Sequence, residues 1–199
     1  MKIFLDVGAH IGQTLDVVID PIYKFDLIHC FEPSFACCNQ LTSLYHDPRI
    51  VVHNFGLLNE KCQRTLHGAG TIGATVYLEK YRGNDPGYSE VCYFEQASEW
   101  FAQKIRPDDI VYMKVNCEGA ECDILADLMD SGEIVKVDAV MVDFDVRKIP
   151  SQRHREVETL DRLKTFPSVR VLLCNEVMVG RTHAERTRNW LSVAERYWK

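Results

Sequence analysis

The chain has 199 residues, of which 46% are hydrophobic and 26% are charged, and its formal net charge is −6 at pH 7. We expect one folded domain over residues 1–199. Because the sequence has no run of Lys or Arg and no stretch of about 18 apolar residues, we expect neither nucleic acid nor a membrane as a partner. The first residues have the pattern of a strand rather than a signal peptide, which predicts a cytoplasmic protein.

The first predicted element is a strand over residues 3–7, apolar except for Asp6. Gly8 and Gly12 follow it, and an amphipathic segment over residues 15–19 predicts a helix. A strand, a glycine-containing loop and a helix in this order present backbone N–H groups to nucleotide-like ligands in α/β proteins. An ordinary turn without a ligand is the alternative.

The glycine spacing favours one class of ligand over two others. A dinucleotide fingerprint needs glycines at the first, third and sixth positions, and from Gly8 these later positions are His10 and Gln13. A Walker loop ends in Gly-Lys-Ser/Thr, whereas residues 12–14 are Gly-Gln-Thr. Asp6 at the end of the strand would repel a pyrophosphate and suits a ligand with a positive charge or hydroxyl groups.

The rest of the chain alternates between strand and helix patterns. The segments predicted as strands are 27–31, 50–55, 91–94, 110–115, 137–144, 169–173 and 176–179, with the last two forming an antiparallel pair. The segments predicted as helices are 35–45, with Ser34 as N-cap, and 97–105, 121–130, 152–166 and 184–197. This alternation predicts a Rossmann-like α/β fold, with a mostly parallel sheet, right-handed crossovers and helices on both faces.

Polar side chains follow several of the predicted strands. They are Asp6, Glu32, Asn54, Asn116, Glu118 and Asp143. Ligands of such sheets bind at the carboxyl ends of the strands, so the sequence predicts one polar site at this edge.

Glu32 and the segment 54–56 have the chemistry to bind a nucleoside. Glu32 follows Gly12 by 20 residues and ends the neighbouring strand, where a carboxylate can accept hydrogen bonds from both ribose hydroxyls. Phe55 offers a flat apolar face for an adenine, and the backbone near Gly56 could hydrogen-bond its ring. A solvated Glu32 and a core Phe55 are the alternatives.

Residues 116–121, Asn-Cys-Glu-Gly-Ala-Glu, form the second informative stretch. Glu118 could hold a substrate hydroxyl, act as a general base or bind a cation. Glu121 is expected to complement the dipole of the helix it begins, and Lys114 to pair with Glu118 or Asp143. His10, in the glycine loop, would contact either substrate or solvent.

The eight cysteines include no C-x-x-C pair and no histidine at zinc spacing. We therefore expect reduced thiols and no metal site. The Gly- and Thr-rich segment 68–75 is expected to form part of an acceptor pocket or a lid.

The sequence resembles the FkbM-type family of class I S-adenosylmethionine-dependent methyltransferases. The resemblance rests on residues 4–12, on Phe31-Glu32-Pro33 and on residues 112–121, and its order and spacing cover roughly residues 3–145. It implies a seven-stranded sheet whose last strand is antiparallel, and methyl transfer to a hydroxyl of a sugar or another small natural product.

The resemblance also implies roles for particular residues. Asp6, Gly8, His10 and Gly12 would line the methionine end of S-adenosyl-L-methionine, Glu32 would hold the ribose, and Phe55 and Gly56 would hold the adenine. The full expected set adds Ala9, Thr14, Pro33, Ser34 and Asn116 as cofactor-binding residues, with Glu118 and His10 as catalytic residues.

Two features depart from the family pattern. The family usually has Asp where this chain has Asn116, and its members often carry a segment before the first strand. This chain begins at its first strand, so we expect the part of the site that such a segment covers to be open or to be covered by another subunit of a homo-oligomer. A cofactor-binding partner subunit without activity and, less favoured, an NAD-dependent oxidoreductase remain as alternatives.

Overall fold

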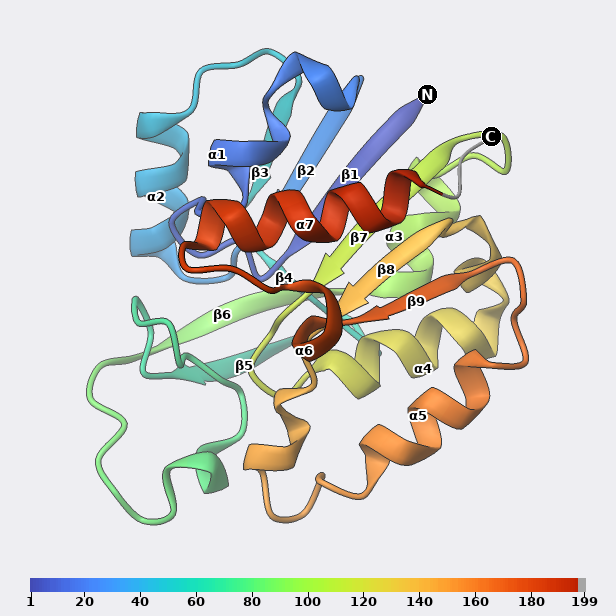
Figure 1. The fold of residues 1–199 in the computed structure, drawn as a ribbon. Helices are drawn as coiled ribbons and strands as arrows, with labels where there is room; N and C mark the ends of the chain where they lie inside the picture. Colours follow the sequence, from blue (N-terminus) through green and yellow to red (C-terminus); the bar gives the residue numbers. More distant parts are fainter. Residues whose placement is uncertain (197–199) are drawn as a thin grey trace.

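A six-stranded parallel sheet forms the centre of the computed structural model, which describes residues 1–196 (Figure 1). The strands lie in the order β3-β2-β1-β7-β8-β9. Their bounds are β1 Lys2–Val7, β2 Leu27–Phe31, β3 Ile50–His53, β7 Ile110–Val115, β8 Ala139–Val142 and β9 Arg170–Leu173. The expected Rossmann-like α/β class, with a parallel sheet between two layers of helices, is confirmed.

The helices and short 3-10 turns connect these strands. The helices are α1 Leu15–Val18, α2 Phe35–Leu44, α3 Ala97–Lys104, α4 Glu121–Ser131, α5 Arg155–Leu163, α6 Cys174–Val177 and α7 His183–Glu195. The 3-10 turns are η1 Pro21–Tyr23, η2 Leu78–Tyr81, η3 Glu133–Lys136 and η4 Asp145–Lys148. Among residues 1–196, none of these helices has both the length and the apolar character of a membrane span.

The side chains of β1 alternate between the two cores of the molecule. Ile3 and Leu5 point to the core that is shared with α3, α4 and α5. Phe4 points to the opposite core and packs against Trp190 of α7, with ring centroids 5.4 Å apart. Figure 1 shows α7 lying across this face of the sheet, so a helix from the end of the chain covers its first strand.

A second, three-stranded sheet lies beside the carboxyl ends of the central strands (Figure 1). It consists of β4 Gly56–Leu58, parallel to β6 Ser89–Gln96, and β5 Cys62–His67, antiparallel to β6. The sequence predicted only residues 91–94 of this sheet. The pattern of β5 is weak because Leu66 is its only buried side chain, so hydrophobic alternation could not indicate it.

The prediction of a seven-stranded sheet with an antiparallel last strand is wrong for the described residues. β9 pairs with β8 in parallel, and residues 174–177, partly predicted as a strand, form α6. Val177 and Met178 are consecutive, yet both pack into the core under α7, which a strand with alternating faces could not do.

Smaller differences concern the ends of elements. The strand predicted for 50–55 ends at His53, because Asn54 leaves it and donates hydrogen bonds to the carbonyls of Glu32 and Pro33, at 3.2 and 3.3 Å. The helix predicted for 152–166 covers Arg155–Leu163. The last helix begins at His183, and Tyr197 of its predicted range lies outside the described residues.

Candidate functional site

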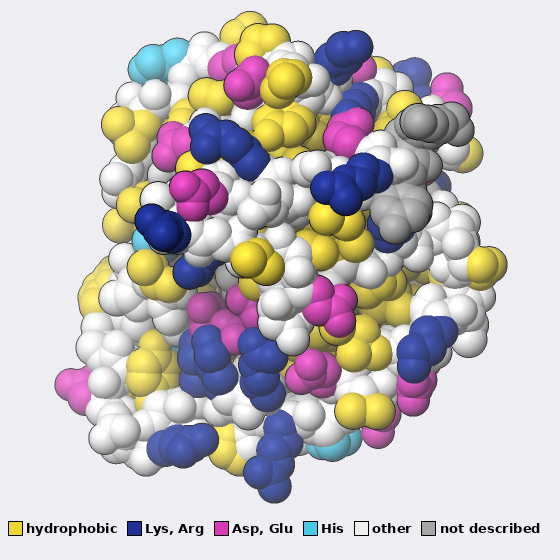
Figure 2. Space-filling view, viewed as in Figure 1, with side chains coloured by type: hydrophobic (Ala, Val, Ile, Leu, Met, Phe, Trp, Pro, Cys, Tyr) yellow, Lys and Arg dark blue, Asp and Glu magenta, His cyan; other side chains and the backbone are white. Residues whose placement is uncertain are grey.

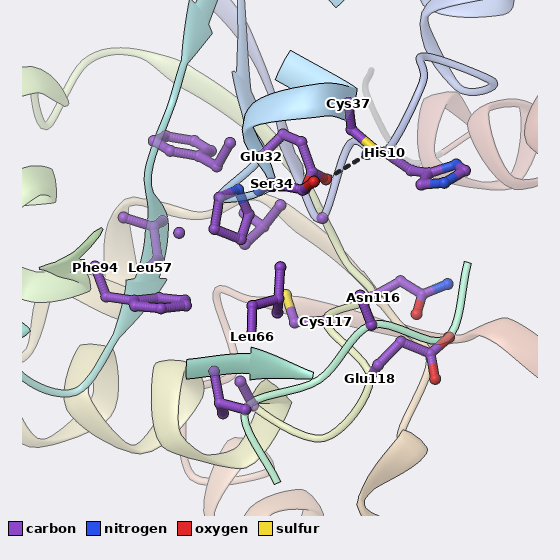
Figure 3. Close-up of a pocket in the computed structure, with 18 of the residues that line it drawn as sticks. His10, Glu32, Ser34, Cys37, Leu57, Leu66, Phe94, Asn116, Cys117 and Glu118 are labelled. Atoms are coloured by element: carbon purple, nitrogen blue, oxygen red, sulfur yellow. Dashed lines mark hydrogen bonds between the residues drawn. The ribbon is translucent and has the colours of Figure 1, made fainter. Parts of the chain in front are cut away.

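A cavity opens at the carboxyl ends of β1, β2 and β7, between the central sheet and the second sheet (Figure 3). The empty space between its walls, including the part open to solvent, is about 630 Å³. Its apolar wall includes Leu57, Leu66 and Phe94. Its polar wall includes His10, Glu32, Ser34, Asn116 and Glu118. The predicted meeting of polar side chains at this edge of the sheet is therefore found for Glu32, Asn116 and Glu118.

The glycine loop after β1 is pressed against the end of β7. Gly8 has φ +83°, and a Cβ built on it would lie 2.0 Å from the carbonyl oxygen of Asn116. The N–H groups of Gly8 and Ala9 both donate to the carbonyl of Phe31, at 3.1 Å. His10 adopts a left-handed φ of +50°, which is uncommon for a residue with a Cβ. Only glycine fits at position 8, and the turn it makes directs His10 toward the cavity.

Glu32 is held in the wall of the cavity by two backbone groups. Its Oε2 accepts from the N–H of His10 at 2.8 Å, and its Oε1 accepts from the N–H of Ser34 at 2.9 Å (Figure 3). Burial raises the pKa of Glu32 to about 7, although these two donors favour its charged form. Each carboxylate oxygen keeps a lone pair for a ligand hydroxyl, so Glu32 can still bind one.

Asp6 lies beneath the cavity rather than in its lining. It is fully buried, and its Oδ1 is 2.6 Å from Nζ of Lys114. Lys114 also donates to the carbonyl of Gly8 at 2.9 Å. The prediction that Lys114 pairs with Glu118 or Asp143 is therefore wrong, because the parallel register places Lys114 directly opposite Asp6.

Glu121 shapes the turn that carries Asn116 and Glu118. Its side chain is fully buried, and Oε1 accepts from the N–H groups of Cys117 and Gly119, both at 3.0 Å. Burial raises the pKa of Glu121 to about 7. Glu121 lies in the first turn of α4 as expected, but it bonds the preceding loop directly instead of only complementing a helix dipole.

Glu118 lies between charged residues from two 3-10 turns. Its Oε2 is 2.5 Å from Nζ of Lys80 in η2 and 3.4 Å from Nζ of Lys148 in η4. Burial, together with the neighbouring carboxyl of Asp145, raises the pKa of Glu118. Figure 2 shows acidic and basic side chains side by side on this face, below α7. Like His10, Glu118 has a left-handed backbone, with φ +55°.

The segment 68–82 covers this side of the site. Thr75 Oγ1 donates to the carbonyl of Glu118 at 2.7 Å, and Lys80 Nζ donates to the carbonyl of Gly73 at 2.8 Å. Tyr77 donates its hydroxyl proton to Asp123 of α4. Gly70, Thr71, Ile72 and Ala74 line the cavity. Residues 68–75, which were predicted to form part of an acceptor pocket or a lid, thus contribute to the wall of the cavity.

A second space, the polar pocket, continues from the cavity toward α7. The two spaces share Gly8, His10, Ile72, Asn116 and Glu118, and the polar pocket adds Gln13, Thr14, Lys114 and His183. His183 Nε2 lies 3.3 Å from Thr14 Oγ1. In Figure 3, His10, Asn116 and Glu118 lie on one side of the cavity, and Leu57, Leu66 and Phe94 lie on the other. The combined space therefore has an apolar end and a polar end.

The other predicted residues take varied positions. Pro33, Ser34 and Gly56 line the cavity, and Thr14 lines the polar pocket. Ala9 is buried, and Gly12 lies under the ring of Tyr45. Phe55 packs on Phe31 and His53, with ring centroids 5.9 and 5.0 Å away, and does not appear in the cavity lining. Asp143 pairs with Arg147 at 3.1 Å, beside a separate pocket.

Several lining residues were not indicated by the sequence. Leu57, Leu66 and Phe94 belong to the second sheet, whose strands were largely missed. Lys80 contacts Glu118, which is 38 residues away in the sequence. His183 contacts Thr14, which is 169 residues away. No local spacing indicates such contacts, because only the packing of η2 and α7 creates them.

No protein-family model matches the chain, and no curated protein matches it. Among solved structures, the chain is similar to the methyltransferase FkbM from Methylobacillus flagellatus KT, with a TM-score of 0.46 and 16% sequence identity. The similarity covers 85% of this chain and 37% of that chain, so this chain spans well under half of the length of the protein it matches.

Proposed function

We propose that this chain is an S-adenosyl-L-methionine-dependent methyltransferase, and that it methylates a hydroxyl group of a small acceptor such as a sugar or another natural product. The observation that carries the proposal is the position of Glu32. Its carboxylate is buried and accepts from two backbone N–H groups, and it lies between the apolar wall of the cavity and the polar pocket. This arrangement suits a ribose between an adenine and an amino acid.

The residues around Glu32 fit the three parts of this cofactor. Leu57, Leu66 and Phe94 offer apolar surface for the adenine. Glu32 has the acceptor capacity for the ribose hydroxyls. Asn116 Oδ1 and His10 Nε2 are buried without a partner among the described residues, so polar groups of a ligand can satisfy them. A dinucleotide fits less well, because His10 and Gln13 stand where its fingerprint needs the second and third glycines.

The chain's own residues would then align the acceptor and remove its proton. When bound, the cofactor supplies a methyl group that is already activated by the positive charge on sulfur. Alignment and exclusion of water are the main tasks left to the protein, and the segment 68–82 is placed to exclude water. The raised pKa of Glu118 brings its carboxylate nearer to the range of an effective general base.

His10 is the second candidate for the proton, but its geometry favours another role. Gln13 Nε2 lies 3.1 Å from His10 Nδ1, so the amide donates to Nδ1 and the ring proton of neutral His10 is on Nε2. His10 therefore donates a hydrogen bond into the site, and Glu118 is the better candidate for the base.

Calorimetric titration tests the proposal. We expect wild-type protein to bind S-adenosylmethionine and S-adenosylhomocysteine but not NADH. Glu32→Ala should lower these affinities by about 1–3 kcal/mol, the scale of a lost buried hydrogen-bond partner. Glu60→Ala, which changes an exposed carboxylate paired with Arg64, is the control and should leave them unchanged.

Two results would contradict the proposal. Tight binding of NADH alone would favour an oxidoreductase. Binding of S-adenosylmethionine without methyl transfer to any member of a broad panel of sugars and hydroxylated metabolites would favour a partner subunit without activity.

A further inference from the structure

We propose that His183, at the start of α7, selects ligands that carry a free α-carboxylate, by binding this carboxylate in the polar pocket. The inference rests on the proposed function and adds a residue that neither the glycine loop nor the strand ends supply. It makes the last helix of the chain part of the cofactor site.

The polar pocket is lined by both hydrogen-bond donors and hydrogen-bond acceptors. His10 presents its Nε2–H there, and this atom is buried without a partner among the described residues. Thr14 and His183 also line the pocket, with Thr14 Oγ1 and His183 Nε2 3.3 Å apart. Asn116 Oδ1, also buried and without a described partner, and Glu118 supply the acceptors. An α-amino acid group matches both kinds of lining group, because its carboxylate accepts and its ammonium donates.

The pocket is connected to the cavity that suits a nucleoside. The two spaces share Gly8, His10 and Asn116, so one ligand can occupy both. Lys114 adds a positive charge to the polar pocket, although Asp6 pairs with it. A single ligand with an apolar ring at one end and a zwitterion at the other would fill the combined space.

α7 holds His183 firmly at the mouth of this pocket. Trp190, Leu191 and Ala194 of α7 are fully buried against the sheet. The side chain of Thr182 caps the helix by accepting from the N–H of Glu185 at 3.1 Å. The backbone position of His183 is therefore fixed by packing, while its side chain lines the pocket and stays accessible to solvent.

Paired ligands test the inference by binding alone, with no acceptor needed. S-adenosylmethionine and its decarboxylated form differ only in the carboxylate. We expect His183→Ala to weaken binding of S-adenosylmethionine by about tenfold or more, the scale of one hydrogen bond to a charged group. It should leave binding of the decarboxylated form unchanged. His183→Gln, which keeps a donor, should recover part of the lost affinity.

His154→Ala is the matched control, because His154 is exposed and lies at the start of a different helix, α5. It should bind both ligands like the wild type. Equal losses for both ligands in His183→Ala, with unchanged thermal stability, would overturn the role in carboxylate selection while leaving the proposed function intact. Failure of wild-type protein to bind either ligand would instead refute the proposed function and this inference together.

Discussion

Lys114 and Asp6 form a buried ion pair between the two central strands, with Nζ 2.6 Å from Oδ1 and side-chain exposures of 6% and 0%. Lys114 also reaches the carbonyl of Gly8, so the pair joins β1, β7 and the glycine loop. The sequence predicted Asp6 as a residue of the ligand site, whereas in the structure Asp6 is the partner of Lys114, and Lys114 lines the polar pocket. Asp6 thus acts on the site through Lys114.

Removal of one partner of this pair should be strongly destabilising, because the other charge stays buried without compensation. We expect Lys114→Met to lower the free energy of unfolding by about 3–5 kcal/mol, measured by urea denaturation. Lys164→Met is the control, since Lys164 and its partner Asp161 are 75% and 64% exposed. Its effect should stay within about 0.5 kcal/mol. Similar small losses in both variants would contradict the structural importance of the Lys114–Asp6 pair.

Gly8 and Gly83 allow backbone strain to be separated from steric conflict. Both have φ +83°, but a Cβ at Gly8 would lie 2.0 Å from the Asn116 carbonyl oxygen, whereas a Cβ at Gly83 would meet nothing within 4 Å. Gly83→Ala should cost only the left-handed conformation, about 1–2 kcal/mol. Gly8→Ala should cost about 1–3 kcal/mol more because the loop must move away from β7. Urea denaturation of both variants measures the difference, and equal losses would contradict the close approach.

Glu121 should make the protein less stable as the pH rises. Its pKa is about 7 in the folded protein and near 4.5 when unfolded, so between these values the folded state binds more protons. Stability then falls with rising pH in that window. Glu121→Gln removes the titration, so relative to wild type it should gain up to about 1.4 kcal/mol per pH unit from pH 5 to 7. Denaturation at pH 5, 6, 7 and 8 measures this, and a constant difference would contradict it.

His29 and His53 should produce the opposite pH dependence. Their rings stack with centroids 5.2 Å apart, and Nδ1 of His29 lies 3.0 Å from Nε2 of His53. Burial lowers the pKa of each to about 4, so the unfolded chain binds more protons between pH 4 and 6.5. Their contribution to stability is complete above pH 6.5 and is lost as the pH falls toward 4.

His53→Phe should therefore flatten the acid side of the stability curve. It keeps an aromatic ring against Phe31 but removes one of the two titrations. Melting temperatures by circular dichroism from pH 4 to 7 measure the slope, with His154→Gln as an exposed control. An unchanged slope in His53→Phe would show that the pair does not govern acid sensitivity.

Lys80 should hold the segment 68–82 against the site. Its Nζ joins Gly73 to Glu118, so Lys80→Met should remove a link between this segment and the turn after β7. We expect faster hydrogen exchange in residues 70–75 and unchanged exchange in β7. Lys61→Met removes an exposed lysine paired with Glu95 and should change neither region. Slow exchange of 70–75 in Lys80→Met would show that Thr75 and Tyr77 suffice as anchors.

The sequence predicted most of the central fold because its elements carry strong local signals. The apolar runs of β1, β2 and β7 need no distant information to be recognised as buried strands, and the placement of Glu32 at a strand end follows from the bounds of β2. The segments with weak hydrophobic patterns were missed or predicted as the wrong element. β5 has one buried side chain. In the segment 176–179, the consecutive residues Val177 and Met178 both pack into the core, which the alternating faces of a strand do not allow.

By itself, the sequence determined the parallel α/β arrangement, the glycine turn at Gly8 and the gathering of Glu32, Asn116 and Glu118 at one edge. These follow from hydrophobic periodicity and from the rule that parallel strands end together. Only the tertiary structure decided that Lys114 pairs with Asp6, that Lys80 reaches Glu118 and that His183 enters the polar pocket. Each of these contacts joins residues at least 38 positions apart, and they depend on strand register and helix packing, which no local pattern encodes.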